Sequence, residues 1–105
     1  ACLLLFLVLL TLSHARAAKK RLCALDSETG VCRGYFPRWF YHRASGVCRV
    51  FIFGGCGGNK NSFDDCHTCM KTCAARIKYR KRKIICHQQN IKYQHMLNPT
   101  GRRPK

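Results

Sequence analysis

Apolar residues form an almost unbroken run at the start of the chain, over residues 1–12. The run is too short to cross a bilayer, which takes about 20 residues. It is followed by Ala15 and Ala17, the small-residue spacing that a signal peptidase requires. We expect residues 1–17 to be a signal peptide with a truncated start, cut after Ala17, with cleavage after Ala15 or Ala18 as alternatives. The other interpretation of the run is a buried core helix.

Two later segments, residues 36–42 and 47–53, are rich in aromatic and β-branched side chains. The short turn-forming link at residues 43–46 separates them, so they predict a β-hairpin. Further along, Ser62 and Asp65 resemble a capping box, which predicts a helix over residues 64–75. Cys69 and Cys73 then lie four residues apart on one helix face. The expected fold class is a small disulfide-rich α+β domain.

The composition narrows the class of protein. A chain of 105 residues holds one small domain with tails, too short for a Rossmann enzyme or a TIM barrel. Its 9 cysteines predict disulfides and therefore a secreted, extracellular protein. The 4 acids and the scattered histidines form no plausible nucleophile–base pair. We therefore expect no enzyme, no metal site and no cofactor.

The formal net charge of +16 is unevenly distributed. Residues 18–73, which begin with a short basic segment at 18–22, contain all the acids, whereas residues 74–105 contain none. This change marks the boundary of a basic C-terminal tail. In a secreted protein such a tail suits a heparin-like glycosaminoglycan or an anionic membrane surface, not nucleic acid. The candidate residues are Arg76, Lys78, Arg80, Lys81, Arg82 and Lys83.

The tail also has a weak helical pattern, because Ile77, Ile84 and Ile91 recur every seven residues. They predict one apolar stripe on a helix that ends by residues 98–101. The alternative is a solvated, mobile basic tail that serves only solubility.

Six cysteines show the spacing Cys-x8-Cys-x15-Cys-x7-Cys-x12-Cys-x3-Cys, from Cys23 to Cys73. Spacing alone allows 15 pairings. Over residues 22–74, however, the chain closely resembles the Kunitz-type (pancreatic trypsin inhibitor) domain. The shared residues also include Thr29-Gly30, Phe40-Tyr41, Phe51, Phe53-Gly54-Gly55-Cys56, Asn61, Phe63 and Cys69-Met70-Lys71-Thr72-Cys73.

The resemblance implies a Kunitz fold at residues 23–73, with a twisted two-stranded hairpin and a C-terminal helix. It implies the bridges Cys23–Cys73, Cys32–Cys56 and Cys48–Cys69. It also implies that Asn61 hydrogen-bonds to buried backbone.

In Kunitz inhibitors, the residue after the second cysteine enters the specificity pocket of a serine protease, and here that residue is Arg33. A guanidinium pairs well with the pocket carboxylate of a trypsin-like enzyme. The resemblance therefore implies a secreted, reversible inhibitor of such proteases, with a hint of a haemostatic target from the basic tail. The expected contact residues are Val31, Cys32, Arg33, Gly34, Tyr35 and Phe36. For Tyr35 and Phe36, simple packing in the hairpin is the alternative.

Cys66 and Cys86 are additional to the family pattern. We expect them to form a fourth bridge in a monomer, with an intermolecular bridge or two free thiols as alternatives. Cys66 and Cys69 also match a redox or zinc Cys-x-x-Cys motif, but the Kunitz framework already uses Cys69.

A second hypothesis is a Kunitz-type toxin that blocks an ion channel or binds a receptor. Some members of the family keep the scaffold and use clusters of basic residues for that purpose. The Gly30-x-Cys32-Arg33-Gly34 loop favours inhibition.

Overall fold

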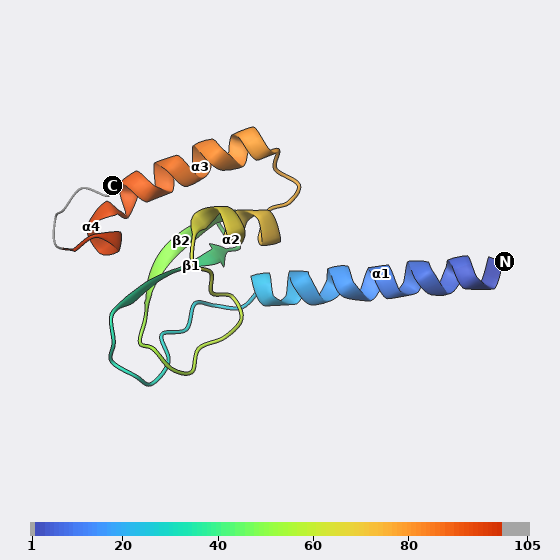
Figure 1. Ribbon diagram of the computed structural model, residues 1–105, viewed down its shortest axis with the longest axis horizontal. Coiled ribbons are helices and arrows are strands. Elements are labelled where there is room, and N and C mark those ends of the chain that lie inside the picture. Colours follow the sequence, from blue (N-terminus) through green and yellow to red (C-terminus); the bar gives the residue numbers. More distant parts are fainter. Residues whose placement is uncertain (1, 100–105) are drawn as a thin grey trace.

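The computed structural model describes residues 2–99, apart from the side chains of residues 10–20. Figure 1 shows two strands and four helices along this part of the chain. In chain order they are α1 (Cys2–Cys23), β1 (Phe36–His42), β2 (Val47–Phe53), α2 (Cys66–Cys73), α3 (Tyr79–Lys92) and α4 (Gln94–Leu97).

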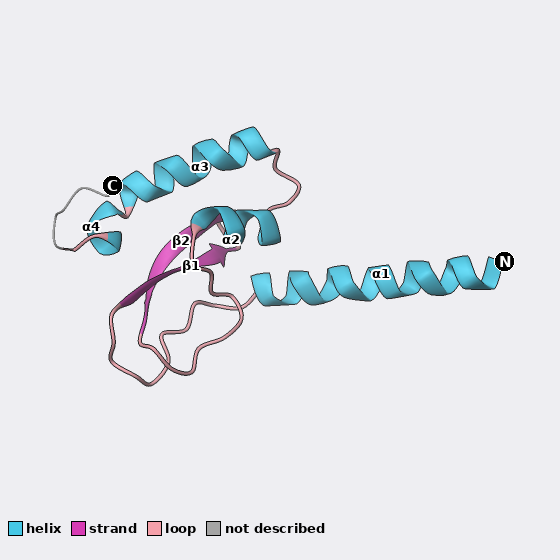
Figure 2. Ribbon diagram, viewed as in Figure 1, coloured by secondary structure: helices cyan, strands magenta, loops and turns pink. Residues whose placement is uncertain are grey.

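The two strands form the predicted antiparallel hairpin (Figure 2). Phe36 pairs with Phe53 at its open end and His42 with Val47 beside the turn. Gly46 takes the left-handed conformation that the turn needs, with φ of 70°. Side chains alternate between the two faces of a strand, and this alternation buries Trp39 and Val50 in the core.

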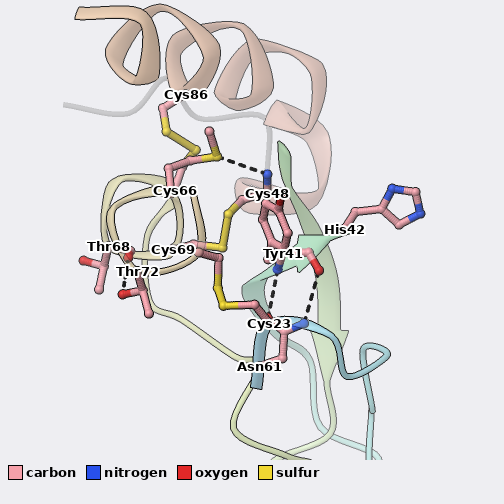
Figure 3. The surroundings of a disulfide bond; sticks show 12 residues. Cys23, Tyr41, His42, Cys48, Asn61, Cys66, Thr68, Cys69, Thr72 and Cys86 are labelled. Atoms are coloured by element: carbon pink, nitrogen blue, oxygen red, sulfur yellow. Dashed lines mark hydrogen bonds between the residues drawn. A yellow bond between two sulfur atoms is a disulfide. The ribbon is translucent and has the colours of Figure 1, made fainter. Parts of the chain in front are cut away.

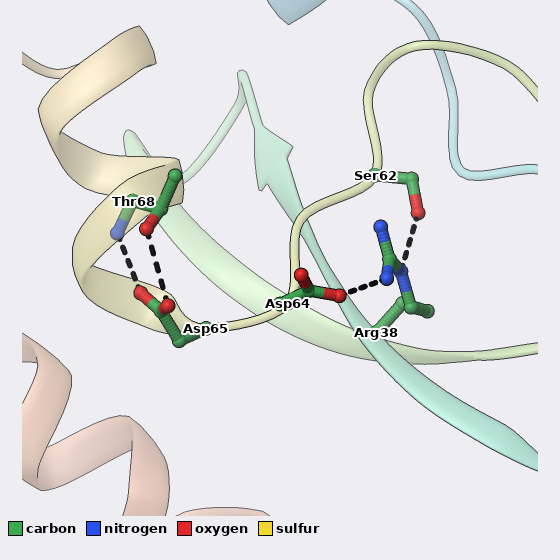
Figure 4. Close-up of polar contacts among 5 residues, drawn as sticks. All are labelled: Arg38, Ser62, Asp64, Asp65 and Thr68. Atoms are coloured by element: carbon green, nitrogen blue, oxygen red, sulfur yellow. Dashed lines mark hydrogen bonds and ion pairs between the residues drawn. The ribbon is translucent and has the colours of Figure 1, made fainter.

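Helix α2 begins at Cys66, two residues later than predicted, and Asp65 is its N-cap. The Asp65 carboxylate accepts hydrogen bonds from the backbone N–H of Thr68 at 2.7 Å and from its hydroxyl at 3.1 Å (Figure 4). The predicted capping box from Ser62 is wrong. Ser62 instead accepts a hydrogen bond from Arg38, which also pairs with Asp64.

Four disulfides hold these elements together, and three of them start from α2. Cys66, Cys69 and Cys73 share one face of the helix, as their spacing requires. They connect it to Cys86 of α3, Cys48 of β2 and Cys23 at the end of α1 (Figure 3). The remaining bridge, Cys32–Cys56, does not involve α2. The four pairings agree with the expectations from the sequence.

Helix α1 extends away from the rest of the molecule (Figure 1). The side chains of residues 3–9 are 56–79% exposed and therefore add nothing to the core. A buried core helix is thus the wrong interpretation of residues 2–9. Among residues 2–99, no helix has both the length and the apolar character needed to cross a membrane. Cleavage after Ala17 stays a prediction.

The chain beyond α2 folds back over the core as a C-terminal extension, residues 75–97, that contains α3 and α4 (Figure 1). The predicted stripe is wrong, because Ile84 and Ile91 are 59% and 61% exposed. The packed face of α3 instead includes Ile85 and Cys86. The bridge from Cys86 to Cys66 determines which face of α3 packs against the core. The seven-residue repeat of isoleucines does not indicate that face. Helix α4 ends at Leu97, just before residues 98–101, where the sequence predicts the end of the helix.

Candidate functional site

The segment between α1 and β1 forms a loop whose backbone is tied to the end of β2. The N–H of Gly34 donates to the carbonyl oxygen of Gly54 at 2.8 Å. The N–H of Gly54 donates in turn to the carbonyl oxygen of Thr29 at 2.9 Å. Between these two hydrogen bonds, the disulfide from Cys32 to Cys56 joins the same two segments. The loop is therefore held in shape by its neighbour rather than by a helix or a sheet of its own.

Glycine allows the two segments to approach this closely. A Cβ atom on Gly54 would collide with the carbonyl oxygen of Cys32, and one on Gly30 would collide with that of Cys56. Gly30 also has a φ of 81°, which side-chain-bearing residues rarely adopt. Glycine at these two positions thus lets the loop pack directly against the segment that follows β2.

The structure places the six predicted contact residues, 31–36, in one continuous exposed segment. Val31 is 90% exposed, and Arg33 is also classed as exposed. Within the described residues, no hydrogen bond or ion pair holds the Arg33 guanidinium. The Arg33 guanidinium is therefore exposed on a backbone of fixed conformation and is available to bind a partner.

The two aromatic residues of the segment differ in their surroundings. The Phe36 ring lies so close to Gly34 that a Cβ atom there would come within 2.6 Å of the ring. Phe36 nevertheless remains 53% exposed, so packing and contact with a partner are compatible. The Tyr35 hydroxyl donates to the carbonyl oxygen of Met96 in α4 at 3.1 Å. The sequence contained no sign of this contact, because 61 residues separate the two partners.

The predicted polyanion-binding residues lie at the start of the C-terminal extension, and five of the six are exposed: Arg76, Lys78, Arg80, Lys81 and Lys83. The exception is Arg82, whose guanidinium donates to the carbonyl oxygens of Ala75 at 3.4 Å and Ile77 at 3.0 Å. Arg82 therefore stabilises the turn into α3 and is less available to a ligand.

Comparison with known proteins identifies the domain. The model of the Kunitz/Bovine pancreatic trypsin inhibitor domain matches residues 22–74. A relative named Kunitz-type serine protease inhibitor spermatin, from Walterinnesia aegyptia, is 44% identical over 75 residues, which is 69% of this chain and 93% of that protein. The Actinia tenebrosa protease inhibitors are 51% identical over 51 residues, 49% of this chain and 18% of theirs.

Among solved structures, the complex between SmCI and human carboxypeptidase A4 contains a similar chain. It has a TM-score of 0.51 and 45% sequence identity, covering 55% of this chain and 35% of that one. Together with the four bridges and the hairpin, these matches show that the chain belongs to the Kunitz/BPTI family. The family is made of protease inhibitors rather than enzymes.

Proposed function

We propose that the protein reversibly inhibits trypsin-like serine proteases by placing Arg33 in their primary specificity pocket. The observation that carries the proposal is the exposed Arg33 on a loop fixed by Cys32–Cys56 and by the backbone bond from Gly34 to Gly54. A loop that is ordered before binding loses little conformational entropy when it binds. The guanidinium can pair with two oxygens of the carboxylate at the base of a trypsin-type pocket.

In that arrangement the Arg33–Gly34 peptide bond meets the protease nucleophile as a substrate bond would. If it is cleaved, the new amine at Gly34 stays in place, because the Gly34 N–H is bonded to Gly54 and the Cys32 side is bridged to Cys56. A leaving amine that does not depart favours resealing of the bond. The same contacts that shape the loop thus make its cleavage unproductive.

The test is the substitution Arg33→Glu, measured against trypsin, plasmin, kallikrein, thrombin and factor Xa. Repulsion from the pocket carboxylate should weaken inhibition of the susceptible enzymes by at least about 1,000-fold, as for a central anchor residue. Arg43→Glu is the matched control, because it makes the same charge change at an exposed turn residue and should inhibit normally. Equal inhibition by wild type and R33E would overturn the assignment. An inactive wild type that blocks a potassium channel would instead support the toxin hypothesis.

We also propose that the C-terminal extension binds heparin-like glycosaminoglycans or anionic membranes. Its support is the exposure of Arg80, Lys81 and Lys83 on α3, with no acidic residue anywhere from residue 74 onward. Cations concentrated on a short helix create a local positive potential that attracts polyanions. The extension is bridged to α2 and hydrogen-bonded to Tyr35, so these charges have a fixed position relative to the loop at residues 31–36.

Heparin-affinity chromatography tests this second proposal without removing the extension, whose loss would leave Cys66 unpaired. The variant R80Q/K81Q/K83Q should elute at a clearly lower salt concentration than wild type. The matched control, R43Q/K60Q/K71Q, removes the same charge from exposed residues elsewhere and should elute near wild type. Equal decreases in the elution salt concentration of the two variants would mean that heparin binding depends only on net charge.

For the N-terminal segment we propose removal by signal peptidase after Ala17 and secretion of the remainder. The apolar, exposed side chains of residues 3–9 and their absence from the core support this proposal. The four disulfides also require an oxidising compartment.

A further inference from the structure

The C-terminal extension is built into the hydrophobic core. The ring of Tyr93 meets the indole of Trp39 edge-on, with 6.3 Å between ring centroids. Trp39 is 3% exposed, and Cys86 is completely buried. Met96 and Leu97 of α4 also pack against the core cluster. The position of α4 is therefore set by the Cys86 disulfide in the middle of the extension and by side-chain packing at its C-terminal end.

Helix α4 lies beside the loop at residues 31–36, through the hydrogen bond from Tyr35 to Met96. Trp39 of β1 and Tyr35, just before the strand, are four residues apart, a spacing that places them on the same side of an extended chain. That side is covered by the extension, through the Tyr93 contact and the hydrogen bond from the Tyr35 hydroxyl to Met96. Figure 1 shows α4 near the beginning of β1, away from the hairpin turn. The Tyr35 side chain nonetheless stays 51% exposed.

We propose that α4 positions Tyr35 and makes the C-terminal extension part of the protease-facing surface. The inference rests on the proposed function, because it assumes that Arg33 occupies the specificity pocket. Tyr35 is then two residues beyond Arg33, on the side of the leaving amine. A tyrosine whose hydroxyl is already anchored has less rotamer freedom to lose when a protease covers its ring. The extension thereby contributes to affinity without touching Arg33.

A double-mutant cycle against trypsin tests the coupling. Tyr35→Phe removes the anchor but keeps the ring, and C66A/C86A releases α3 and α4 from the core. Each change alone should raise the inhibition constant about 2- to 10-fold, the effect of freeing one interface side chain. The triple variant should be no weaker than the weaker of the two, because both changes abolish the same contact. Strictly additive effects would overturn the proposal.

Tyr41→Phe is the matched control, since it deletes a hydroxyl from a hairpin tyrosine whose own hydrogen bonds are made by its backbone. It should leave the inhibition constant unchanged, alone or combined with C66A/C86A. If C66A/C86A fails to fold, Tyr93→Ala replaces it in the cycle, because this variant detaches the extension from Trp39 with all four bridges intact. A Y93A cycle without coupling to Y35F would overturn the proposal in the same way.

R33E, measured in parallel, distinguishes a failure of the proposed function from a failure of the proposed role of α4. If wild type inhibits trypsin and R33E does not, the proposed function stands, and additivity in the cycle defeats the role of α4 alone. If wild type inhibits no protease of the panel, the proposed function fails and the role of α4 in protease binding fails with it.

Discussion

At the scale of single residues, Asn61 shows how a buried polar group connects parts of the chain that are distant in sequence. It is completely buried. Its side-chain oxygen accepts from the N–H of Tyr41 at 2.9 Å, and its amide nitrogen donates to the carbonyl oxygen of Tyr41 at 3.1 Å (Figure 3). The same nitrogen also donates to the carbonyl oxygen of Leu25 at 2.7 Å. The family resemblance implied this role, and the structure confirms it. One side chain thus joins β1 to the segment that leads into the loop at residues 31–36.

Asn61→Ala should therefore lower the free energy of unfolding by about 3 kcal/mol, because it removes three hydrogen bonds and leaves backbone groups without partners. Guanidinium denaturation with the disulfides intact measures the loss. Asn90→Ala is the control, since Asn90 is exposed on α3 and its loss should change stability by less than about 0.5 kcal/mol. Similar losses in the two variants would contradict the central role of Asn61.

At the scale of elements, the sequence predicted best where the pattern is local. The hairpin has the predicted bounds because aromatic and β-branched runs and a turn are properties of neighbouring residues. The start of α2 was misplaced because Ser62 and Asp65 both suit a cap, and only the folded chain brings Arg38 to Ser62. In α3, the isoleucine repeat indicated the wrong face, because the bridge from Cys86 decides which face is buried.

In the candidate site, too, some features follow from the sequence and others depend on contacts that only the folded chain makes. Arg33 and its flanking residues could be proposed from the sequence because the cysteine spacing and the shared residues resemble the Kunitz domain, whose contact residue follows the second cysteine. Gly54 is one of the residues shared with that domain, and its carbonyl oxygen accepts the hydrogen bond from Gly34 that holds the loop. The contact between Tyr35 and Met96 could not be predicted, because it depends on how the C-terminal extension returns to the core.

At the scale of the whole molecule, the disulfides serve two separate purposes. Three bridges meet at α2 and join it to α1, the hairpin and α3, whereas Cys32–Cys56 shapes only the loop around residues 31–36. A domain of about 60 residues buries only about 60% of the surface of its unfolded chain, so its stability is marginal without such links. Removing different bridges should therefore affect different regions.

The variant C66A/C86A should lose about 3 kcal/mol of stability, the expectation for a bridge across some twenty residues. Hydrogen exchange should accelerate across α3 while the hairpin amides stay protected. The comparison variant C32A/C56A should show the reverse, with faster exchange around residues 29–34 and an unchanged α3. Uniform acceleration in both variants would mean that the bridges stabilise the fold only as a whole.

The return of the C-terminal extension has a consequence for protein engineering. The family model matches residues 22–74, but a cassette cut at residue 74 for grafting onto another polypeptide would leave Cys66 without Cys86 and remove the Tyr93 ring from the indole of Trp39. The portable unit of this Kunitz domain therefore runs from residue 22 to residue 97.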